Sequence, residues 1–197
     1  MRGRDADSAR HQWPDRHQFR QVRALRAEQH RPRSDLRRAG DLRRFRRRRP
    51  LLAGRPGVEV KAELLLAAFP AGPRTAPILQ LREPLSFWGG VDPATGRLID
   101  PRSIDHDKDL VGRIALIHEL RGSSSASSVL LELIHAGRTP TAIIVAKPDA
   151  ILAVAAIVGR EMGWTVPPIL RLDVDDLERL PDGAPATVFE DGMVRLG

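Results

Sequence analysis

The 197-residue sequence contains no cysteine, so it has no disulfide, no thiolate zinc site and no iron–sulfur cluster of its own. Histidine is the remaining strong metal ligand, but the histidines are scattered and show neither HxxxH nor HxH spacing. Their positions are His11, His17, His30, His106, His118 and His135. We therefore expect no metal site and no bound cofactor on this chain alone.

Long apolar runs are also missing. The longest one, residues 150–158, ends at Gly159–Arg160 and is far shorter than the roughly 20 residues that a membrane-spanning helix needs. It predicts a buried helix. The N-terminus is highly charged and has no apolar core segment, so it does not resemble a secretory signal. We expect a soluble, cytoplasmic protein with no membrane partner.

Lysine is absent from residues 1–57, which contain 18 arginines and 6 acidic residues. Residues 58–197 carry 14 basic and 19 acidic residues, so this larger part is mildly acidic. The whole positive net charge of +7 therefore comes from the first quarter of the chain. An acidic domain has no electrostatic reason to seek a phosphate backbone, so nucleic acid is not an expected partner of residues 58–197.

Residues 1–57 show no sustained apolar period of 3.6 or 2.0, and their high charge predicts disorder. A basic nucleic-acid-binding arm is one interpretation, although such arms usually mix lysine with arginine. A solvated tail is the second. The third, which we favour, is a start site placed too far upstream in GC-rich DNA, with the true start near Val58 or Val60. The predicted organisation is thus a disordered Arg-rich segment over 1–57 and a folded domain over 58–197.

From Val58 onward the sequence changes to short strands, turns and two helices. Predicted strands cover 60–67, 77–81, 97–99, 111–118, 141–146 and 168–172, with a closing pair at 186–189 and 193–196. Predicted helices cover 129–136 and 148–162, each followed by a glycine that favours helix termination. A short acidic helical turn is predicted over 173–180, and a turn-rich loop over 86–93. This order implies an α/β layer built onto a strand-rich base.

The stretch Arg121-Gly-Ser-Ser-Ser-Ala-Ser-Ser128 joins a predicted strand to a predicted helix. The first turn of a helix offers free N–H groups and a partial positive charge, which suit a carboxylate or phosphate. Gly122 would let the backbone approach such a ligand closely. A plain capped turn remains the alternative, because serine is a preferred N-cap. No glycine spacing here matches a phosphate-binding loop or a dinucleotide fingerprint.

Several sequence pieces, taken together in order, resemble the aconitase X swivel-domain family. They are EPLSFWGGVDPATG at 83–96, GRIAL at 112–116, RGSSS at 121–125 with VLLEL at 129–133, AIIV at 142–145 and PDAIL at 148–152. Each piece is weak alone, but the ordered set is specific and covers roughly residues 60–189. The resemblance implies a swivelling β/β/α fold, with a strand-rich base or flattened barrel and flanking helices.

The resemblance also implies a function. The family includes small subunits of phosphomevalonate dehydratase and of cis-3-hydroxy-L-proline dehydratase, which pair with a large catalytic subunit that holds iron, often as an iron–sulfur cluster. In such a hydro-lyase a base takes a proton while the metal stabilises the leaving hydroxide. The resemblance makes Ser123 the base and places Arg121, Gly122, Ser124 and Ser125 at the substrate. Serine needs a desolvated, cation-rich pocket for this role, so we expect the isolated chain to be inactive.

Trp88, Gly89, Gly90 and Asp92 are predicted to line the contact with the large subunit, and a structural turn with a packed tryptophan is the alternative. The chain departs from the family pattern at Glu119-Leu120, where small residues are usual before Arg121, and at Ala126, where glycine is common. Both departures bear on substrate identity. Phosphomevalonate, hydroxyproline and other hydroxy acids all remain open, and we favour hydroxyproline-type chemistry.

Two other functions are weighed against the lyase. A phosphohistidine carrier using His118 or His135 is one alternative, but the Gly-Gly-x-x-Ser-His-like stretch of such carriers is absent, so we expect both to be ordinary histidines. A non-enzymatic protein that binds nucleic acid through residues 1–57 is the other alternative, and it predicts salt-sensitive binding that is lost when the segment is deleted.

Overall fold

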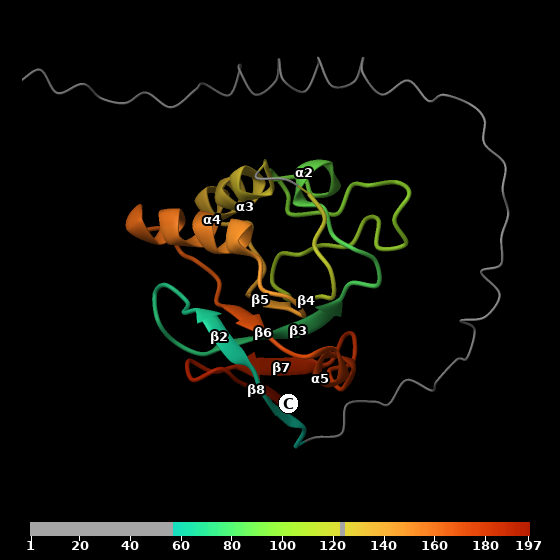
Figure 1. Ribbon diagram of the computed structural model, residues 1–197, viewed down its shortest axis with the longest axis vertical. Coiled ribbons are helices and arrows are strands. Elements are labelled where there is room, and N and C mark those ends of the chain that lie inside the picture. The colour runs from blue at the N-terminus through green and yellow to red at the C-terminus, as the bar shows by residue number, and fades with distance from the viewer. Residues whose placement is uncertain (1–56, 123–124) are drawn as a thin grey trace, which may run out of the picture. The chain divides into compact units, whose positions relative to one another are not determined.

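The computed structural model describes residues 57–122 and 125–197. It arranges them as one mixed sheet with two longer helices layered on one face (Figure 1). The predicted Arg-rich segment lies outside the described residues except for Gly57, and so do Ser123 and Ser124. The domain boundary at residue 58, the nucleic-acid-binding arm and the upstream start site therefore stay predictions.

The strand order of the sheet is β1-β8-β7-β3-β4-β5-β6-β2. The four strands from β3 to β6 run parallel, and the remaining pairings are antiparallel. Parallel neighbours need crossover connections, which α3 (Ser125–Ala136) and α4 (Ala150–Glu161) provide after β4 and β5. The strands are β1 (Glu59–Lys61), β2 (Glu63–Leu66), β3 (Arg74–Gln80), β4 (Ile114–Ile117), β5 (Ala142–Val145), β6 (Ile169–Arg171), β7 (Pro185–Val188) and β8 (Met193–Leu196).

The sheet curls because its two edge strands are consecutive in the sequence. β1 and β2 stand at opposite ends of the strand order, yet only Ala62 separates them. The Ala62 amide donates to the Gly192 carbonyl at 2.9 Å, in the turn between β7 and β8. A Cβ at position 192 would lie 2.5 Å from the Ala62 oxygen, so this close approach requires glycine. The single predicted strand over 60–67 is therefore two strands divided at Ala62, and one short segment supplies both edges.

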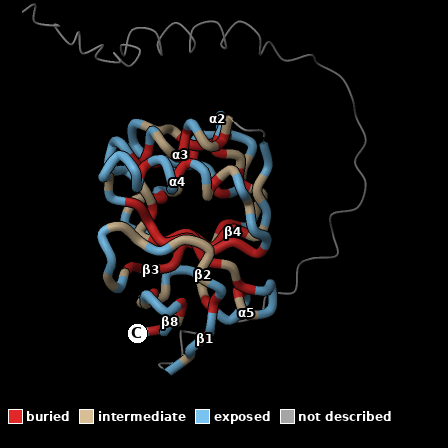
Figure 2. Tube along the Cα trace, turned by 60° about the vertical axis from the view of Figure 1, so that its left-hand side comes forward, coloured by how far each residue is buried: buried red, intermediate tan, exposed pale blue. Residues whose placement is uncertain are grey.

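The side chains of the central strands point alternately into two cores. Ala115 and Ile117 of β4 pack with α3 and α4, whereas Ile114 and Leu116 pack with β1, β7, β8 and α5 (Val174–Glu178). All residues of β4 and β5 are buried, as expected for parallel strands covered on both faces. Figure 2 shows this burial in red through the middle of the fold. The predicted α/β class with a strand-rich base and flanking helices is confirmed.

The two predicted helices are confirmed, but their starts differ. α3 begins at Ser125 instead of 129, so part of the serine stretch forms its first turn. α4 begins at Ala150, after the Asp149 carboxylate, which accepts a hydrogen bond of 2.7 Å from the Ile151 amide. Neither helix, nor any other among residues 57–122 and 125–197, is long and apolar enough to cross a membrane.

The connection between β3 and β4 is less regular than predicted. The expected strand over 97–99 is wrong, because the segment makes only isolated bridges, Val91 with Leu98 and Arg97 with Asp109. Turns flank residues 97–99 on both sides, so the extended segment is too short to form a strand ladder. The expected loop over 86–93 contains the short α2 (Phe87–Gly90), in which Trp88 and Gly89 have non-helical backbone angles.

Candidate functional site

Arg121 and Gly122 lie just beyond the carboxyl end of β4, immediately before α3. A bridge to the chain that leaves β3 fixes their backbone: the Leu85 amide donates to the Glu119 carbonyl at 2.9 Å, and the Arg121 amide donates to the Leu85 carbonyl at 2.8 Å. Ligands of parallel α/β sheets bind beyond the carboxyl ends of the strands. Arg121 and Gly122 are therefore placed at the edge where a ligand is expected.

Gly122 turns the chain from this edge into α3. Its φ of +138° is a backbone conformation that residues with a side chain rarely adopt. Space does not demand glycine here, because a Cβ would make only ordinary contacts, 3.8 Å to Ser86 Oγ and 4.0 Å to Ala126 Cβ. The backbone turn itself explains the glycine.

A small hollow brings the beginnings of α2, α3 and α4 together. Its enclosed volume of about 10 Å³ accommodates no more than a water-sized group, and no hydroxy acid fits inside it. The site is therefore a rim rather than a closed pocket. The lining residues are Phe87, Leu120, Arg121, Gly122, Ala126, Asp149, Ile151 and Leu152.

Charges of both signs stand at this rim. Arg121 is exposed, and Asp149 is half-buried with Oδ1 engaged by the Ile151 amide. Glu119 and Lys147, each two residues away from one of them, are also exposed. Sequence reasoning assigned no role to Asp149. The sequence feature that points to Asp149 is the Pro148-Asp149 pair directly before a helix, because aspartate is a preferred N-cap.

The structure places the predicted substrate residues as follows. Arg121 and Gly122 come together on the rim, and Ser125 is the first residue of α3. Ser123, predicted as the base, and Ser124 lie outside the described residues. The roles of these five residues stay predictions.

The predicted interface residues are placed unevenly. Trp88 is 40 % exposed and Gly89 is exposed, whereas Gly90 is buried and its carbonyl accepts from the Ile99 amide at 2.8 Å. The Asp92 carboxylate accepts from the Ala94 amide at 3.2 Å and from Thr95 Oγ1 at 3.0 Å. Trp88 and Gly89 are thus exposed, whereas Gly90 is not, and Asp92 stabilises a turn.

Asp105 is the one buried charged side chain among the described residues. Its Oδ2 accepts from the amides of Arg82 at 2.8 Å and Glu83 at 3.1 Å, and its Oδ1 lies 2.7 Å from Lys108 Nζ. These bonds join two parts of the connection between β3 and β4, the segment around Asp105 and the segment that leads from β3 to Leu85. Asp105 therefore helps to fix the backbone that in turn holds Arg121.

The residues of this chain do not suit an iron–sulfur cluster, because the sequence has no cysteine. Residues 57–122 and 125–197 contain no group of three or more His, Asp or Glu that could hold a metal ion. His135 packs against Trp164 with ring centroids 4.6 Å apart and ring planes tilted by 54°, which gives it a packing role.

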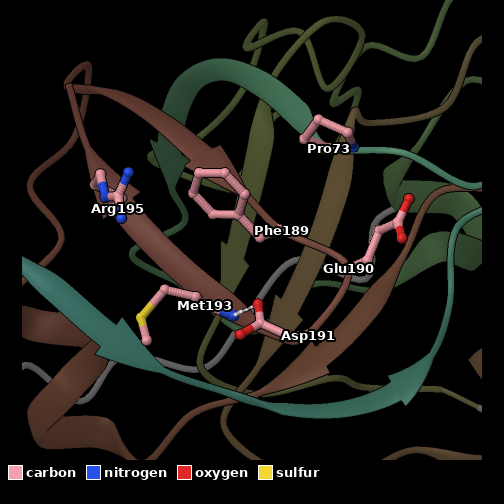
Figure 3. A pocket seen from close by; sticks show the side chains of 6 residues that line it. All are labelled: Pro73, Phe189, Glu190, Asp191, Met193 and Arg195. Atoms are coloured by element: carbon pink, nitrogen blue, oxygen red, sulfur yellow. Dashed lines mark hydrogen bonds between the residues drawn. The ribbon is translucent and has the colours of Figure 1, made fainter.

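A wider hollow lies at the turn between β7 and β8, lined by Pro73, Phe189, Glu190, Asp191, Met193 and Arg195 (Figure 3). The pairing of Arg74 with Val188 places it at the amino end of β3, away from Arg121. Two of its three charged residues are paired, Asp191 with Lys61 at 2.9 Å and Arg195 with Glu59 at 2.5 Å. The hydrogen bond from the Met193 amide is the main reason that the pKa of Asp191 lies below its ordinary value, and the hydrogen bond from Lys61 is the second. Nothing in this hollow points to a ligand.

Comparison with known proteins identifies the family. The model of the aconitase X swivel domain matches residues 67–196. The chain is 47 % identical over 92 residues to a cis-3-hydroxy-L-proline dehydratase of Pseudomonas aeruginosa, covering 47 % of this chain and 16 % of that protein. It is 35 % identical over 126 residues to the phosphomevalonate dehydratase small subunit of Methanothermobacter thermautotrophicus, covering 64 % of this chain and 92 % of that protein.

A solved structure agrees. The crystal structure of Thermococcus kodakaraensis aconitase X (holo-form) superposes with a TM-score of 0.61 at 30 % identity, covering 72 % of this chain and 99 % of that chain. The chain spans under a fifth of the hydroxyproline dehydratase but nearly all of the phosphomevalonate dehydratase small subunit. The resemblance predicted from the ordered sequence pieces is confirmed, and the chain belongs to the aconitase X swivel domain family.

Proposed function

We propose that this chain is the small subunit of a heteromeric hydro-lyase that removes water from a hydroxy acid. The observation that carries the proposal is the open rim around Arg121, where the hollow of about 10 Å³ is too small to enclose a substrate. A site of this kind needs a second polypeptide to complete it. The high coverage of a protein named as a small subunit supports the same interpretation.

In this proposal Ser123 is the base, and Arg121 binds a substrate carboxylate or phosphate. Gly122 gives the ligand access to the backbone, and Ser124 and Ser125 add hydrogen-bond donors. A serine hydroxyl acts as a base only in a desolvated, cation-rich pocket, and the large subunit must complete that pocket. The small subunit alone is therefore inactive. The iron or iron–sulfur cluster belongs to the large subunit, because this chain lacks the thiolates to hold one.

The charges at the rim favour an amino acid as the substrate. The charged residues that line the hollow are one cation, Arg121, and one carboxylate, Asp149, and the exposed Lys147 and Glu119 are two residues away from them in the sequence. A zwitterion such as cis-3-hydroxy-L-proline complements such a mixed surface, whereas phosphomevalonate carries several negative charges and calls for an excess of cations. The 47 % identity to a hydroxyproline dehydratase supports the same choice.

The test is co-expression of the full chain with the aconitase X large subunit of the same genome, followed by assays on cis-3-hydroxy-L-proline and on phosphomevalonate. We expect activity on the hydroxyproline, and a loss of about 10²-fold or more in Ser123→Ala because the base is removed. Ser128→Ala is the matched control, since Ser128 is an exposed serine of α3. Full activity of assembled Ser123→Ala enzyme contradicts the role of Ser123, and no activity on any hydroxy acid contradicts the function.

A further inference from the structure

The outward face of α4 is apolar up to its last turn. Arg160 and Glu161, in the last turn, are the only charged residues of this helix. Four exposed apolar side chains precede or follow them at positions that share one helix face, and the exposed Glu161 lies on that face too, four residues after Ile157. This α4 stripe consists of Val154 (54 % exposed), Ile157 (48 %), Val158 (39 %) and Met162 (50 %).

The neighbouring helix shows that exposure alone does not explain the stripe. α3 packs beside α4 in the same layer (Figure 1) and contributes to the same core. Its outward positions include the polar residues Ser128, Glu132 and His135, all exposed. Exposed apolar side chains gathered on one helix of an otherwise polar layer favour an interaction surface.

The stripe begins at the rim of the candidate site. Ile151, in the first turn of α4, lines the hollow together with Arg121 and Gly122. Phe87 lines it from α2, and the next residue, Trp88, is exposed. A polypeptide that closes the hollow therefore contacts the first turn of α4 and, by continuing along the helix, covers the stripe.

The area of the stripe decides between possible occupants. A helix of 12 residues is about 18 Å long, and four half-exposed side chains on it offer roughly 300 Å². A stable interface buries about 800 Å² on each partner, so a second copy that docks through α4 alone falls short. The area suffices only for a partner that covers the stripe and the site rim together.

We propose that the α4 stripe is a docking surface for the large subunit, which lays an apolar surface along α4 and closes the hollow over Arg121 in the same contact. The inference rests on the proposed function, because it takes the large subunit as the partner. It adds a location to that function. The layer of α3 and α4 faces the large subunit, and the side formed by β1, β7, β8 and α5 does not.

The test compares two charge insertions in the stripe, Val154→Glu and Ile157→Glu, with Val174→Glu. Val174 is as exposed as Ile157, at 48 % each, but lies on α5 against the other core. Each full-length variant is co-expressed with the large subunit, and its dissociation constant is measured by sedimentation after its circular dichroism spectrum and melting temperature are shown to be unchanged. We expect both stripe variants to bind at least tenfold more weakly than the wild type. The control should bind as tightly as the wild type.

Each other outcome contradicts a defined statement. Unchanged binding of both stripe variants to a large subunit that forms an active complex with the wild type overturns the docking surface and leaves the proposed function intact. Failure of the wild type to bind or to give activity overturns the proposed function, and the inference with it. If the stripe variants instead abolish self-association of the chain alone, the occupant is a second copy and the assignment to the large subunit is wrong.

Discussion

Gly159 of α4 lies so close to Ile134 of α3 that a Cβ at position 159 would be 2.7 Å from Ile134 Cγ2 and 3.3 Å from Val166 Cγ2. The two helices pack through this position, and the glycine is a condition of their approach. Glycine within a helix costs about 1 kcal/mol relative to alanine, so only a packing reason accounts for its presence.

Gly159→Ala is therefore expected to destabilise the chain. The gain in helix propensity is smaller than the cost of overpacking, which is about 1–3 kcal/mol for an inserted methyl group in a tight core. We expect a net loss of about 1 kcal/mol in the free energy of unfolding, measured by urea denaturation. Val158→Ala, at an exposed neighbouring position, is the control and should change stability by less than about 0.5 kcal/mol. A rise in stability for Gly159→Ala would show that the helices separate without cost.

Asp105→Asn tests the connection between β3 and β4. The buried carboxylate accepts from two backbone amides and pairs with Lys108, and an asparagine cannot replace all three acceptor contacts. We expect a loss of about 1–3 kcal/mol in unfolding free energy, because a buried hydrogen-bonded charge is removed while its donors stay. Thermal and urea unfolding both measure it.

The control for Asp105 lies two residues away. Asp107 has a positive φ of 64° and an exposed side chain, and asparagine adopts this conformation readily. Asp107→Asn should therefore leave stability unchanged. Equal stability of the two variants would mean that the Asp105 contacts contribute nothing.

The central strands and helices of this fold are predictable from sequence because their signals are local. The apolar run Ile114–Ile117 and the glycines after both helices mark β4, α3 and α4. The start of α3 differs from the prediction because serine favours caps and turns, and only packing of Ala126 and Val129 on the core places residues 125–128 in the helix. The division at Ala62 depends on its contact with Gly192, far along the chain, which no local pattern records.

The candidate site was predictable only in part, for the same reason. Arg121 and Gly122 stand within a continuous motif, so the sequence itself points to them. Asp149 joins them through the parallel pairing of β4 with β5, and Asp105 acts through bonds to residues more than twenty positions earlier. Such contributions come from the topology and become visible only with the fold.

Asp149 combines two roles that one pair of substitutions separates. Asp149→Ala removes the N-cap of α4 and should cost about 1 kcal/mol of stability. Asp149→Asn keeps a good N-cap, so stability should hold, but it removes the negative charge from the rim. With the assembled enzyme we then expect a KM for cis-3-hydroxy-L-proline several-fold higher, because the substrate ammonium loses an attractive charge. An unchanged KM in Asp149→Asn would contradict the amino-acid preference argued from the rim charges.

Arg121→Gln tests the anion-binding role that the proposed function assigns to the rim. The Arg121 side chain is exposed, and its backbone amide alone makes the bond to Leu85, so unfolding free energy should change by less than about 0.5 kcal/mol. Loss of a charge-assisted hydrogen bond to a substrate carboxylate costs about 1.5–3 kcal/mol, which lowers kcat/KM roughly 10- to 100-fold. Steady-state kinetics of the complex with the large subunit measure this loss. Arg113→Gln, an exposed arginine just before the amino end of β4, is the matched control and should retain full activity, because it lies at the opposite end of the strand from the rim. Full activity in both variants would remove Arg121 from the site.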